Sequence, residues 1–409
     1  MNRYRINQMR AAQTRAGLNR RQFLGRAGAF GGAVLLTPSL LAACGGDDED
    51  PKGNGGDTEP GPTADPNKST GDLLMSNWPL YIDPTEDGVT GSVDLFKKAT
   101  GIDLTYNEDF NDNNEYFAAI QPDLANGKAI KPDIIAPTFW LVARLIELGW
   151  VEALPLDQIP NAANLLPSLQ KPLWDPTGAY SLPWQSGMTG IAYNIDATGR
   201  ELTSVEDLFD PEFKGKIGML TEMRDTLGLV LLGLGKDPST ISFDDAADAF
   251  DKIEAAKNDG QIRQFTGNDY QDDLVAGNFA ACVAWSGDVA QLALDTPSLR
   301  FVIPEEGGMQ WSDCMVIPKG ADSIKEAAAW MNYVYDPVNA ARIAAYVTYN
   351  SPVAGVQDEL RKNPDTVGLA DSELMFPDEE TLGRLKVFKA LDEDEEAQFD
   401  DRFSSITTG

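Results

Sequence analysis

The sequence predicts an α/β protein of two lobes, each built on a mostly parallel sheet with helices on both faces. Short apolar runs alternate with amphipathic helical patterns, which is the order of strands joined by crossover helices. Of the 409 residues, roughly 340 follow a polar N-terminal region, and this is more than a single core usually holds. We find no internal repeat in the sequence.

The first half of the folded region opens with strands and helices in alternation. Apolar runs predict the strands, and patterns with a period of about 3.6 residues predict the helices. The strands are expected at residues 73–76, 102–106 and 133–136, and the helices at residues 92–99, 114–126 and 138–148. This order predicts parallel strands, because parallel neighbours need a crossover connection between them.

The alternation resumes in the second half of the chain. Strands are expected at residues 189–194, 217–221, 279–285 and 313–317, and helices at residues 243–257 and 323–335. The last helix should end before Asp336-Pro337, since proline cannot donate a backbone N–H within a helix. We expect a cleft between two such lobes, and ligands of parallel sheets bind beyond the carboxyl ends of the strands.

The N-terminal segment is typical of an export signal. A basic region ends in Arg20 and Arg21, an apolar stretch follows, and small residues precede Cys44. The paired arginines resemble a twin-arginine signal, and the sequence LAAC that ends at Cys44 resembles a bacterial lipobox. The apolar stretch is shorter than the ~20 residues that span a bilayer. We therefore expect residues 1–43 to be a signal peptide and Cys44 to carry a lipid anchor on the extracytoplasmic face of the cell membrane.

The segment that follows Cys44 is rich in glycine, proline and aspartate and has almost no apolar side chain. Such a composition cannot bury enough apolar surface to form a core. Residues 44–70 are therefore predicted to be a disordered tether, and the folded part should begin near residue 71.

The composition excludes several classes of function. The chain has 64 acidic and 33 basic side chains and a net charge of −31, which repels nucleic acid and attracts cations. It has no histidine, so Ser-His-Asp catalysis and histidine metal sites are excluded. Cys282 and Cys314 cannot close a zinc site and are either a disulfide pair or two small buried residues. No metal or cofactor is predicted.

Two short motifs couple an aromatic ring to a carboxylate. Trp285 and Asp288 lie three residues apart in WSGD, after an apolar strand, and Trp311 and Asp313 lie two apart in WSD. If the second motif is extended, both of its side chains point to the same side. Carboxylates and aromatic faces together suit an ammonium ligand. Core packing of the tryptophans and turn or cap roles of the aspartates are the alternatives.

A series of sequence blocks resembles the spermidine/putrescine-binding proteins of ABC importers. In chain order the blocks are LLMSNWPLYI, FKKATGIDLTYNED, KPDIIAPTFWL, YSLPWQSGMTGIAYN, PEFKGKIGMLTEMRD, DLVAGNFAACVAWSGDV, VIPEEGGMQWSDCMVIPKGA and YNSPV. The resemblance implies the type II fold of periplasmic binding proteins. It also implies a monomer that captures a polyamine outside the cytoplasm and delivers it to an ABC permease.

The same resemblance implies where the two lobes divide. Three crossings are expected near residues 187–192, 307–312 and 357–362. The expected lobe I comprises residues 71–189 and 312–358, and the expected lobe II comprises residues 190–311 and 359–409.

The resemblance also implies a set of ligand-binding residues in the cleft. These are the aromatic side chains Trp78, Tyr81, Trp285, Trp311 and Tyr349, the carboxylates Asp225, Asp288 and Asp313, and, as weaker candidates, Glu222 and Phe139. Three positions depart from the family pattern: Pro79 stands where the family has a hydroxyl, Leu80 where it has an acid, and Pro137 where it has a small polar residue. One amine contact of lobe I is therefore missing, which leaves a different small solute as an alternative.

A surface-tethered hydrolase that uses two carboxylates is the alternative from another class. Retaining glycosidases need two acids only about 5 Å apart, and an acidic chain supplies many pairs. No nucleophile elbow, phosphate loop or metal motif supports an enzyme.

The absence of histidine also bears on the pH dependence of binding. Carboxylates at their ordinary pKa values, about 4, would leave the affinity nearly flat from about pH 6 to 8.

Overall fold

The computed structural model describes residues 65–86 and 88–408. The predicted signal peptide, Cys44 and residues 44–64 of the predicted tether lie outside these residues. Residues 65–70, which we also assigned to the tether, are held against the folded domain. Lys68 forms an ion pair with Asp322 at 2.7 Å, and the hydroxyls of Thr70 and Ser323 lie 2.7 Å apart. The folded part therefore begins earlier than the composition indicates, because these polar residues find polar partners.

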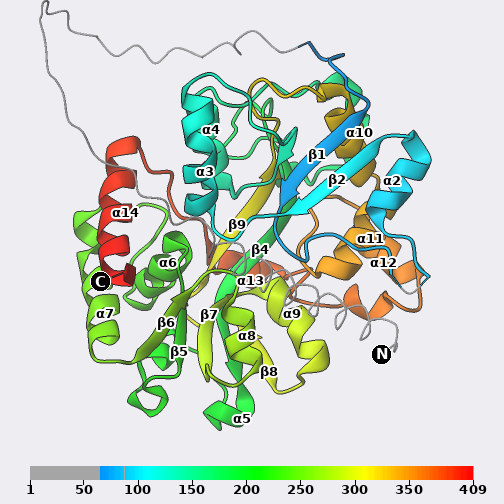
Figure 1. Ribbon diagram of the computed structural model, residues 1–409. Helices are drawn as coiled ribbons and strands as arrows, with labels where there is room; N and C mark the ends of the chain where they lie inside the picture. Colours follow the sequence, from blue (N-terminus) through cyan, green and yellow to red (C-terminus); the bar gives the residue numbers. More distant parts are fainter. Residues whose placement is uncertain (1–64, 87, 409) are drawn as a thin grey trace, which may run out of the picture.

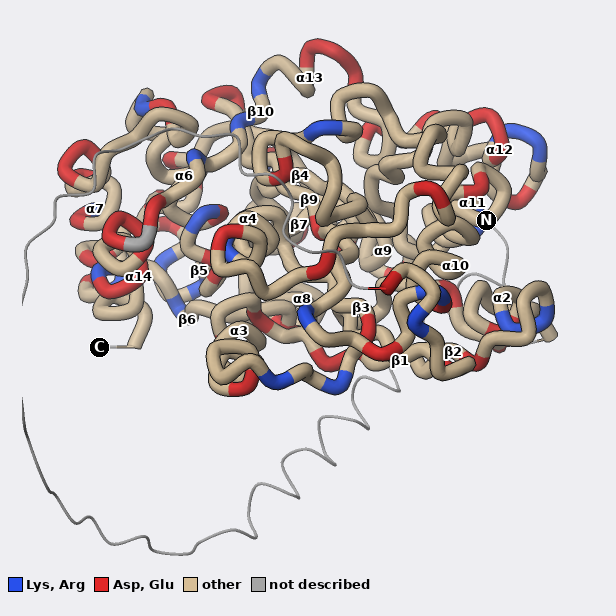
Figure 2. Tube along the Cα trace, turned by 90° about the horizontal axis from the view of Figure 1, so that it is seen from above, with Lys and Arg blue, Asp and Glu red and all other residues tan. Residues whose placement is uncertain are grey.

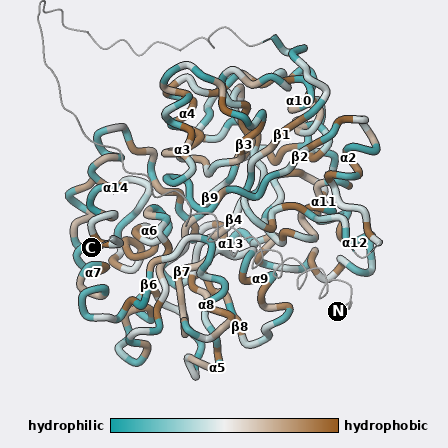
Figure 3. The backbone as a smooth tube through the Cα atoms, viewed as in Figure 1, coloured by the Kyte–Doolittle hydropathy of each residue, from teal (hydrophilic) through white to brown (hydrophobic). Residues whose placement is uncertain are grey.

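Two hydrophobic cores divide the described chain. We call lobe I the part whose core draws on segments 73–184 and 311–375, and lobe II the part whose core draws on segments 191–309 and 388–406. Hydrophobic segments gather inside each lobe in Figure 3. A small third cluster, of Met188, Ile303 and Leu385, lies where the chain passes from one lobe to the other.

Lobe I contains a parallel three-stranded sheet of order β2-β1-β3. Its strands are β1 (Asp72–Asn77), β2 (Asp103–Glu108) and β3 (Ile134–Ile135). Leu73 pairs with Leu104 and Met75 with Ile134, so the buried side chains of neighbouring strands lie side by side. Helices of lobe I lie around this sheet at the top and on the right of Figure 1. They are α2 (Ser92–Thr100), α3 (Asn113–Ala125), α4 (Phe139–Glu147), α10 (Ile324–Val334), α11 (Pro337–Val347) and α12 (Val356–Lys362).

The second sheet has the order β10-β9-β4-β7-β5-β6, with β8 also paired to β4. Its strands are β4 (Leu182–Asn194), β5 (Ile217–Leu220), β6 (Ile262–Thr266), β7 (Ala281–Trp285), β8 (Leu299–Val302), β9 (Gly308–Met315) and β10 (Leu385–Lys386). Strands β5, β6 and β7 are parallel, whereas β4 runs antiparallel to β7 and β9. In Figure 1, β4 and β9 run through the middle of the molecule and connect the two lobes.

The helices of lobe II surround its part of this sheet. They are α5 (Ile195–Thr198), α6 (Met223–Gly233), α7 (Ala247–Asn258), α8 (Tyr270–Val275), α9 (Ser286–Asp295) and α14 (Glu393–Thr408). The short helix α13 (Glu379–Gly383) lies on the segment that returns from lobe I to lobe II. In α14, Phe399, Phe403 and Ile406 are buried at helical spacing, so this acidic helix is held by one apolar stripe.

The third passage between the lobes corrects our boundary. We expected it at residues 357–362, but α12 packs in lobe I through Val356 and Leu360, and Met375 still belongs to that core. Phe388 is the first residue after this segment that belongs to the core of lobe II. The chain therefore crosses between residues 376 and 387. The last of the resembling sequence blocks, YNSPV, ends at residue 353, so the resemblance gave no signal for the true crossing.

The parallel strands of both lobes end at the boundary between the lobes. The last residues of these strands are Asn77, Glu108 and Ile135 in lobe I and Leu220, Thr266 and Trp285 in lobe II. The loops and helix N-termini that follow these strands therefore face one another. Cys282 in β7 and Cys314 in β9 are buried free thiols. The structure therefore agrees with two small buried residues and not with a disulfide pair.

Candidate functional site

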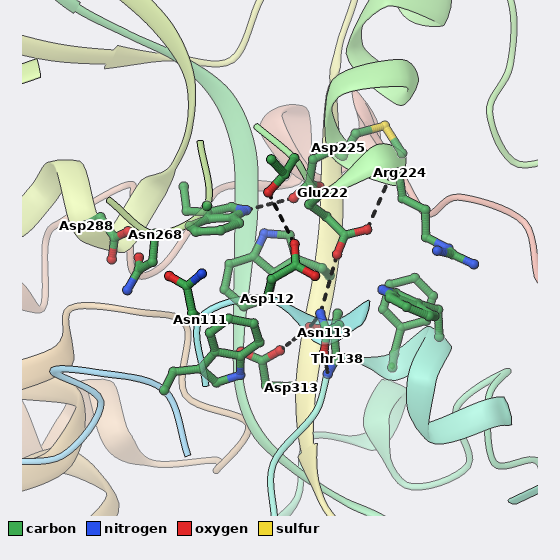
Figure 4. Close-up of a pocket in the computed structure, with 18 of the residues that line it drawn as sticks. Asn111, Asp112, Asn113, Thr138, Glu222, Arg224, Asp225, Asn268, Asp288 and Asp313 are labelled. Atoms are coloured by element: carbon green, nitrogen blue, oxygen red, sulfur yellow. Dashed lines mark hydrogen bonds between the residues drawn. The ribbon is translucent and has the colours of Figure 1, made fainter. Parts of the chain in front are cut away.

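A cavity lies between the lobes, at the carboxyl ends of the parallel strands, and Figure 4 shows its lining. Every residue that the sequence analysis named for the ligand site lines this cavity, including the weaker candidates Glu222 and Phe139. Pro79 lines it as well, whereas Leu80 does not. Leu80 instead adopts a positive φ of 60°, and its backbone N–H donates to Glu108. The position that carries an acid in the family therefore brings no side chain to this cavity.

Asp313 lies on β9, where an extended backbone points it and Trp311 toward the cavity. The β-pairing of Trp311 with Gly187 and of Asp313 with Gln185 establishes that conformation. The Tyr81 hydroxyl donates to one carboxylate oxygen at 2.9 Å, and the Thr138 hydroxyl donates to the other at 2.7 Å. Both donors are neutral side chains, so the charge of Asp313 is solvated but not cancelled.

Asp288 is held in the same way in the first turn of α9. Tyr349 donates to one oxygen at 2.8 Å, and Tyr270 and Gln271 each donate to the other at 2.9 Å. Tyr349 follows α11 of lobe I, so its hydrogen bond to Asp288 crosses the boundary between the lobes. The carboxylate again meets neutral donors.

Asp225 and Glu222 lie at the N-terminus of α6, where the helix dipole favours negative charge. The Asp225 carboxylate accepts from the Thr189 hydroxyl at 2.8 Å and from the Trp285 indole at 2.7 Å. Glu222 is the N-cap of α6 and accepts from the side-chain amide of Asn113 at 3.4 Å. Asp225 is therefore both a first-turn residue and a cavity residue, so its helix-terminal position does not remove it from the site.

Burial raises the pKa values of these carboxyl groups. The pKa of Asp225 and that of Asp288 rise to about 6, and that of Asp313 rises to about 7. The pKa of Glu222 rises to about 8, again chiefly because burial removes water from the charged form. These raised pKa values predict that affinity changes with pH near neutrality, whereas the sequence alone, with no histidine, predicts a nearly flat dependence.

Arg224 is the basic member of the described lining, but its guanidinium points away from the carboxylates. Figure 4 shows its side chain turned away from Glu222, Asp225 and Asp313. The guanidinium forms a buried ion pair with Glu396 of α14 and lies 4.0 Å from the centre of the Trp140 ring. In the described chain, Asp225, Asp288 and Asp313 form no ion pair with lysine or arginine within 4 Å.

Aromatic rings form the walls between the carboxylates. Trp311 meets Trp285 edge to face with ring centres 6.4 Å apart and meets Tyr349 at 5.4 Å. Tyr81 contacts Tyr349 at the same distance. Trp78 donates its indole N–H to the Ala136 carbonyl at 3.0 Å, which fixes the ring in lobe I. The polar edges of these rings are mostly engaged, so apolar faces remain for a ligand.

The sequence analysis missed the polar residues that lobe I contributes. Asn111, Asp112 and Asn113 follow β2 and line the cavity. The Thr221 hydroxyl of lobe II donates to Asp112 at 3.2 Å, so these residues also join the lobes. The run FNDNN after the predicted strand was the available signal, because polar residues at a carboxyl strand end mark a site. The other missed residues are Thr138, Trp140, Thr221, Arg224, Gly267, Asn268, Met309, Gln310 and Phe388.

Metal ligands and membrane-spanning helices are the two remaining features that could bear on function. Over residues 65–86 and 88–408, no group of three or more Cys, Asp or Glu side chains is arranged to hold a metal ion. In the same part of the chain, each helix is too short or too polar to span a membrane.

The fold and the cavity together define a class of protein: a two-lobed binding protein that encloses a small solute at the strand ends between its lobes. Comparison with known proteins gives the family. The chain belongs to the family of bacterial extracellular solute-binding proteins, which it matches over residues 92–367. It is therefore an extracytoplasmic binding protein and not an enzyme, which excludes the hydrolase alternative.

Individual relatives agree with this family. The chain is 30% identical over 326 residues to the putrescine-binding periplasmic protein PotF of Escherichia coli K12, covering 73% of this chain and 84% of PotF. It is 25% identical over 311 residues to the spermidine/putrescine-binding periplasmic protein of the same organism, covering 76% and 84%.

A solved structure agrees as well. The spermidine/putrescine ABC transporter substrate-binding protein PotD of Streptococcus pneumoniae superposes with a TM-score of 0.68 at 25% identity, covering 82% of this chain and 98% of PotD. The predicted family and the predicted periplasmic-binding-protein fold are thereby confirmed.

Proposed function

We propose that this protein captures a polyamine, putrescine or spermidine, in the cavity between its lobes and delivers it to an ABC importer. One observation carries the proposal: Asp225, Asp288 and Asp313 line one cavity with aromatic walls, and the side chains that donate hydrogen bonds to them are neutral. Buried carboxylates without a cationic partner are costly. A ligand with several ammonium groups supplies the missing charge.

The walls suit the rest of such a ligand. An ammonium about 4 Å from a carboxylate gains roughly 4 kcal/mol gross at an effective dielectric near 20, and desolvation removes part of this. An aromatic face adds about 0.5–2 kcal/mol by cation–π attraction and also covers methylene groups. Several such contacts together reach micromolar affinity, about −8 kcal/mol.

Relatives named for putrescine and spermidine binding support the same class of ligand.

We assign the ligand contacts to the side chains that the sequence predicted. Asp313 and Trp311 form the centre, Asp288 and Tyr349 one end, and Asp225 with Trp285 the other. In this proposal the two lobes open and close around the ligand by a hinge, which β4 and β9 provide.

The proposed export and tether complete the function. Residues 1–43 direct export by the twin-arginine route, and a lipid on Cys44 anchors a monomer near its permease. Changing Cys44→Ser should release the protein from the membrane fraction, as detected by fractionation and immunoblotting. Retention of the variant in the membrane fraction would contradict the lipid anchor.

A ligand panel tests the binding function. The soluble domain should be stabilised by putrescine or spermidine in a thermal-shift assay, by about 2.7 kcal/mol at a ligand concentration 100 times the Kd. Cadaverine and spermine test chain length, and amino acids and sugars are the controls. Stabilisation by a neutral sugar or an anionic amino acid, with none by amines, would replace the polyamine with a different solute. Pro79 and Leu80 make that outcome worth testing.

A further inference from the structure

Arg224 poses a problem for a site that binds cations. It is the one positively charged side chain among the described residues of the cavity lining, and it lies between Glu222 and Asp225 in the chain. Residues one or two apart on a helix do not face one another. Burial raises the pKa values of Glu222 and Asp225, but the charge of Arg224 lowers them in part even from its present position. A guanidinium paired with either carboxylate would compete with an ammonium ligand for the same charge.

The structure holds this guanidinium elsewhere. Its Nη2 atom pairs with the Oε2 atom of Glu396, and the exposed fractions of the two side chains are 5% and 9%. Figure 4 shows the arginine side chain directed away from the carboxylates of Glu222, Asp225 and Asp313. Glu396 itself belongs to α14 and does not line the cavity.

Stability does not account for this ion pair. Arg224 Nε and Glu396 Oε1 are buried and have no hydrogen-bond partner among the described residues. Buried ion pairs with unsatisfied atoms recover little of their desolvation cost, and apolar residues often replace them without loss of stability. The placement of Glu396 behind the cavity therefore calls for another explanation.

We propose that Glu396 is a positioning residue for the ligand site: it holds Arg224 away from Glu222 and Asp225, so that these carboxylates remain free for an ammonium group of the ligand. This inference rests on the proposed polyamine function. It makes the C-terminal helix α14 a determinant of affinity although the helix touches no ligand.

Trp140 completes the arrangement from the other lobe. Its ring covers the guanidinium at 4.0 Å by a cation–π contact. Trp140 belongs to α4 of lobe I, whereas Arg224 and Glu396 belong to lobe II. Arg224 is therefore held from both sides when the lobes are together, which is the state in which the ligand is enclosed.

Other charged groups near the pair set the conditions of the test. Asp400 of α14, Arg144 of α4 and Asp112 at the N-terminus of α3 interact with the cluster. Burial and the neighbouring Glu396 raise the pKa of Asp400 to about 6. Measurements at pH 7 and 8 therefore keep Asp400 mostly charged, whereas Glu222, whose pKa is about 8, changes its charge between these two pH values.

Affinity measurements on matched variants test the proposal. Glu396→Gln removes the charge at nearly constant shape, frees Arg224 to pair with Glu222 or Asp225, and should weaken putrescine and spermidine binding about tenfold or more. Adding Arg224→Met removes the competing cation and should restore affinity to within about threefold of the parent. Glu395→Gln is the control on the same helix, because Glu395 pairs with the nearby Lys389.

Recovery of affinity in the double variant distinguishes a positioning role of Glu396 from a purely structural one. If the double variant binds as weakly as Glu396→Gln, or if Glu396→Gln binds as tightly as the parent, the proposal is wrong. Should Glu396→Gln fail to fold, Glu396→Asp keeps the charge but shortens the side chain, and it should show a smaller loss in the same direction. An unchanged affinity in that variant would also count against positioning.

A measurement without ligand distinguishes this inference from the proposed function. In ligand-free Glu396→Gln, an Arg224 released toward Glu222 and Asp225 should lower the pKa values of both groups. The free energy of unfolding rises between pH 8 and pH 7 because groups with raised pKa values take up protons in the folded state. With lower pKa values this rise, measured by chemical denaturation, should be smaller than in the parent. If no amine binds the parent, the proposed function fails, and this comparison still decides whether Glu396 positions Arg224.

Discussion

Single carboxylates in the cavity combine two properties that surface acids lack. They are buried, and their hydrogen bonds come from neutral hydroxyl, amide and indole groups. Asp313 shows both: the exposed fraction is 4%, and its donors are Tyr81 and Thr138. An acid in this state gains strongly from a cation, because neither water nor a basic side chain already compensates its charge.

Asp313→Asn should weaken amine binding more than any change on the surface. The amide keeps the shape of the carboxylate but removes its charge, so the loss should be about 2–5 kcal/mol if an ammonium is paired there. Isothermal calorimetry with putrescine and spermidine measures the loss. Asp401→Asn, at an exposed position of α14, is the control and should bind like the parent. Equal affinities of the Asp313 variant and the parent would remove Asp313 from the site.

The pH dependence of affinity follows from the raised pKa values. With pKa values of about 6 for Asp225 and Asp288 and about 7 for Asp313, lowering the pH from 8 to 5 protonates these groups in the empty site. An ammonium ligand must then displace protons, so affinity should fall steadily through this range. Calorimetry at successive pH values measures the fall. An affinity that stays constant down to pH 5 would show that other groups bind the ligand.

The same groups should make the empty protein more stable in mild acid. In the unfolded chain these aspartates have a pKa near 3.9, so from about pH 7 down to 4 the folded state binds more protons than the unfolded state. Their contribution to the unfolding free energy therefore rises as the pH falls through this window. Saturating amine keeps these carboxylates charged and should remove their part of the rise, whereas Asp400, which lies outside the cavity, still contributes to it. Denaturation curves with and without putrescine make the comparison.

At the scale of elements, contact between strands shapes the aromatic wall. Gly187 of β4 pairs with Trp311 of β9, and a Cβ at Gly187 would lie 2.3 Å from the Trp311 ring. The strand therefore needs glycine here because the indole lies directly against its backbone. β4 and β9 thus fix the position of the ring at the centre of the cavity.

Gly187→Ala should both destabilise the protein and weaken binding. The added methyl group forces Trp311 from its place, and such overpacking typically costs about 1–3 kcal/mol. Urea denaturation measures the first effect and calorimetry the second. Gly383→Ala is the matched control, because no atom lies within 4 Å of the place that its added methyl group would occupy. Full affinity in Gly187→Ala would mean that the ring can move without harm to the site.

Sequence patterns predicted the elements with strong apolar runs and missed the polar ones. The apolar runs at β1, β5 and β7 and the amphipathic α10 were recognisable, whereas β6, with the sequence IRQFT, exposes its middle residues and resembles a loop. Helix α14 was missed because its many acidic residues outnumber the apolar residues Phe399, Phe403 and Ile406, which are the ones it buries. The ring-and-acid motifs predicted cavity residues, but long-range contacts such as Arg224 with Glu396 follow only from the fold.

At the scale of the whole molecule, negative charge is spread over both lobes. Figure 2 shows acidic segments around the outside of the described chain, with fewer basic segments among them. The sequence as a whole has a net charge of −31. Repulsion among these charges opposes the compact state, and mobile cations screen it.

Added salt should therefore raise the melting temperature of the ligand-free protein. From about 0.1 to 1 M KCl the screening length falls from about 10 to 3 Å, which weakens repulsion between acidic side chains on the surface. Differential scanning calorimetry across this range should show a rising Tm, while sucrose serves as the uncharged control. A Tm that falls with KCl would mean that attractive ion pairs dominate the surface.

The interrupted course of the chain through lobe I has a consequence for its synthesis. The core of lobe I needs Leu73 and also Met375, so a ribosome must complete nearly the whole protein before this core can close. Much of lobe II, from residue 191 to residue 309, emerges in between as one continuous piece. The early strands β1, β2 and β3 can pair with one another, but the helices α10 and α11 that complete their core are made only after that piece. Contacts of such long sequence separation form slowly. The apolar surface that stays exposed until the last quarter of the chain has been translated makes aggregation a hazard for this protein during synthesis.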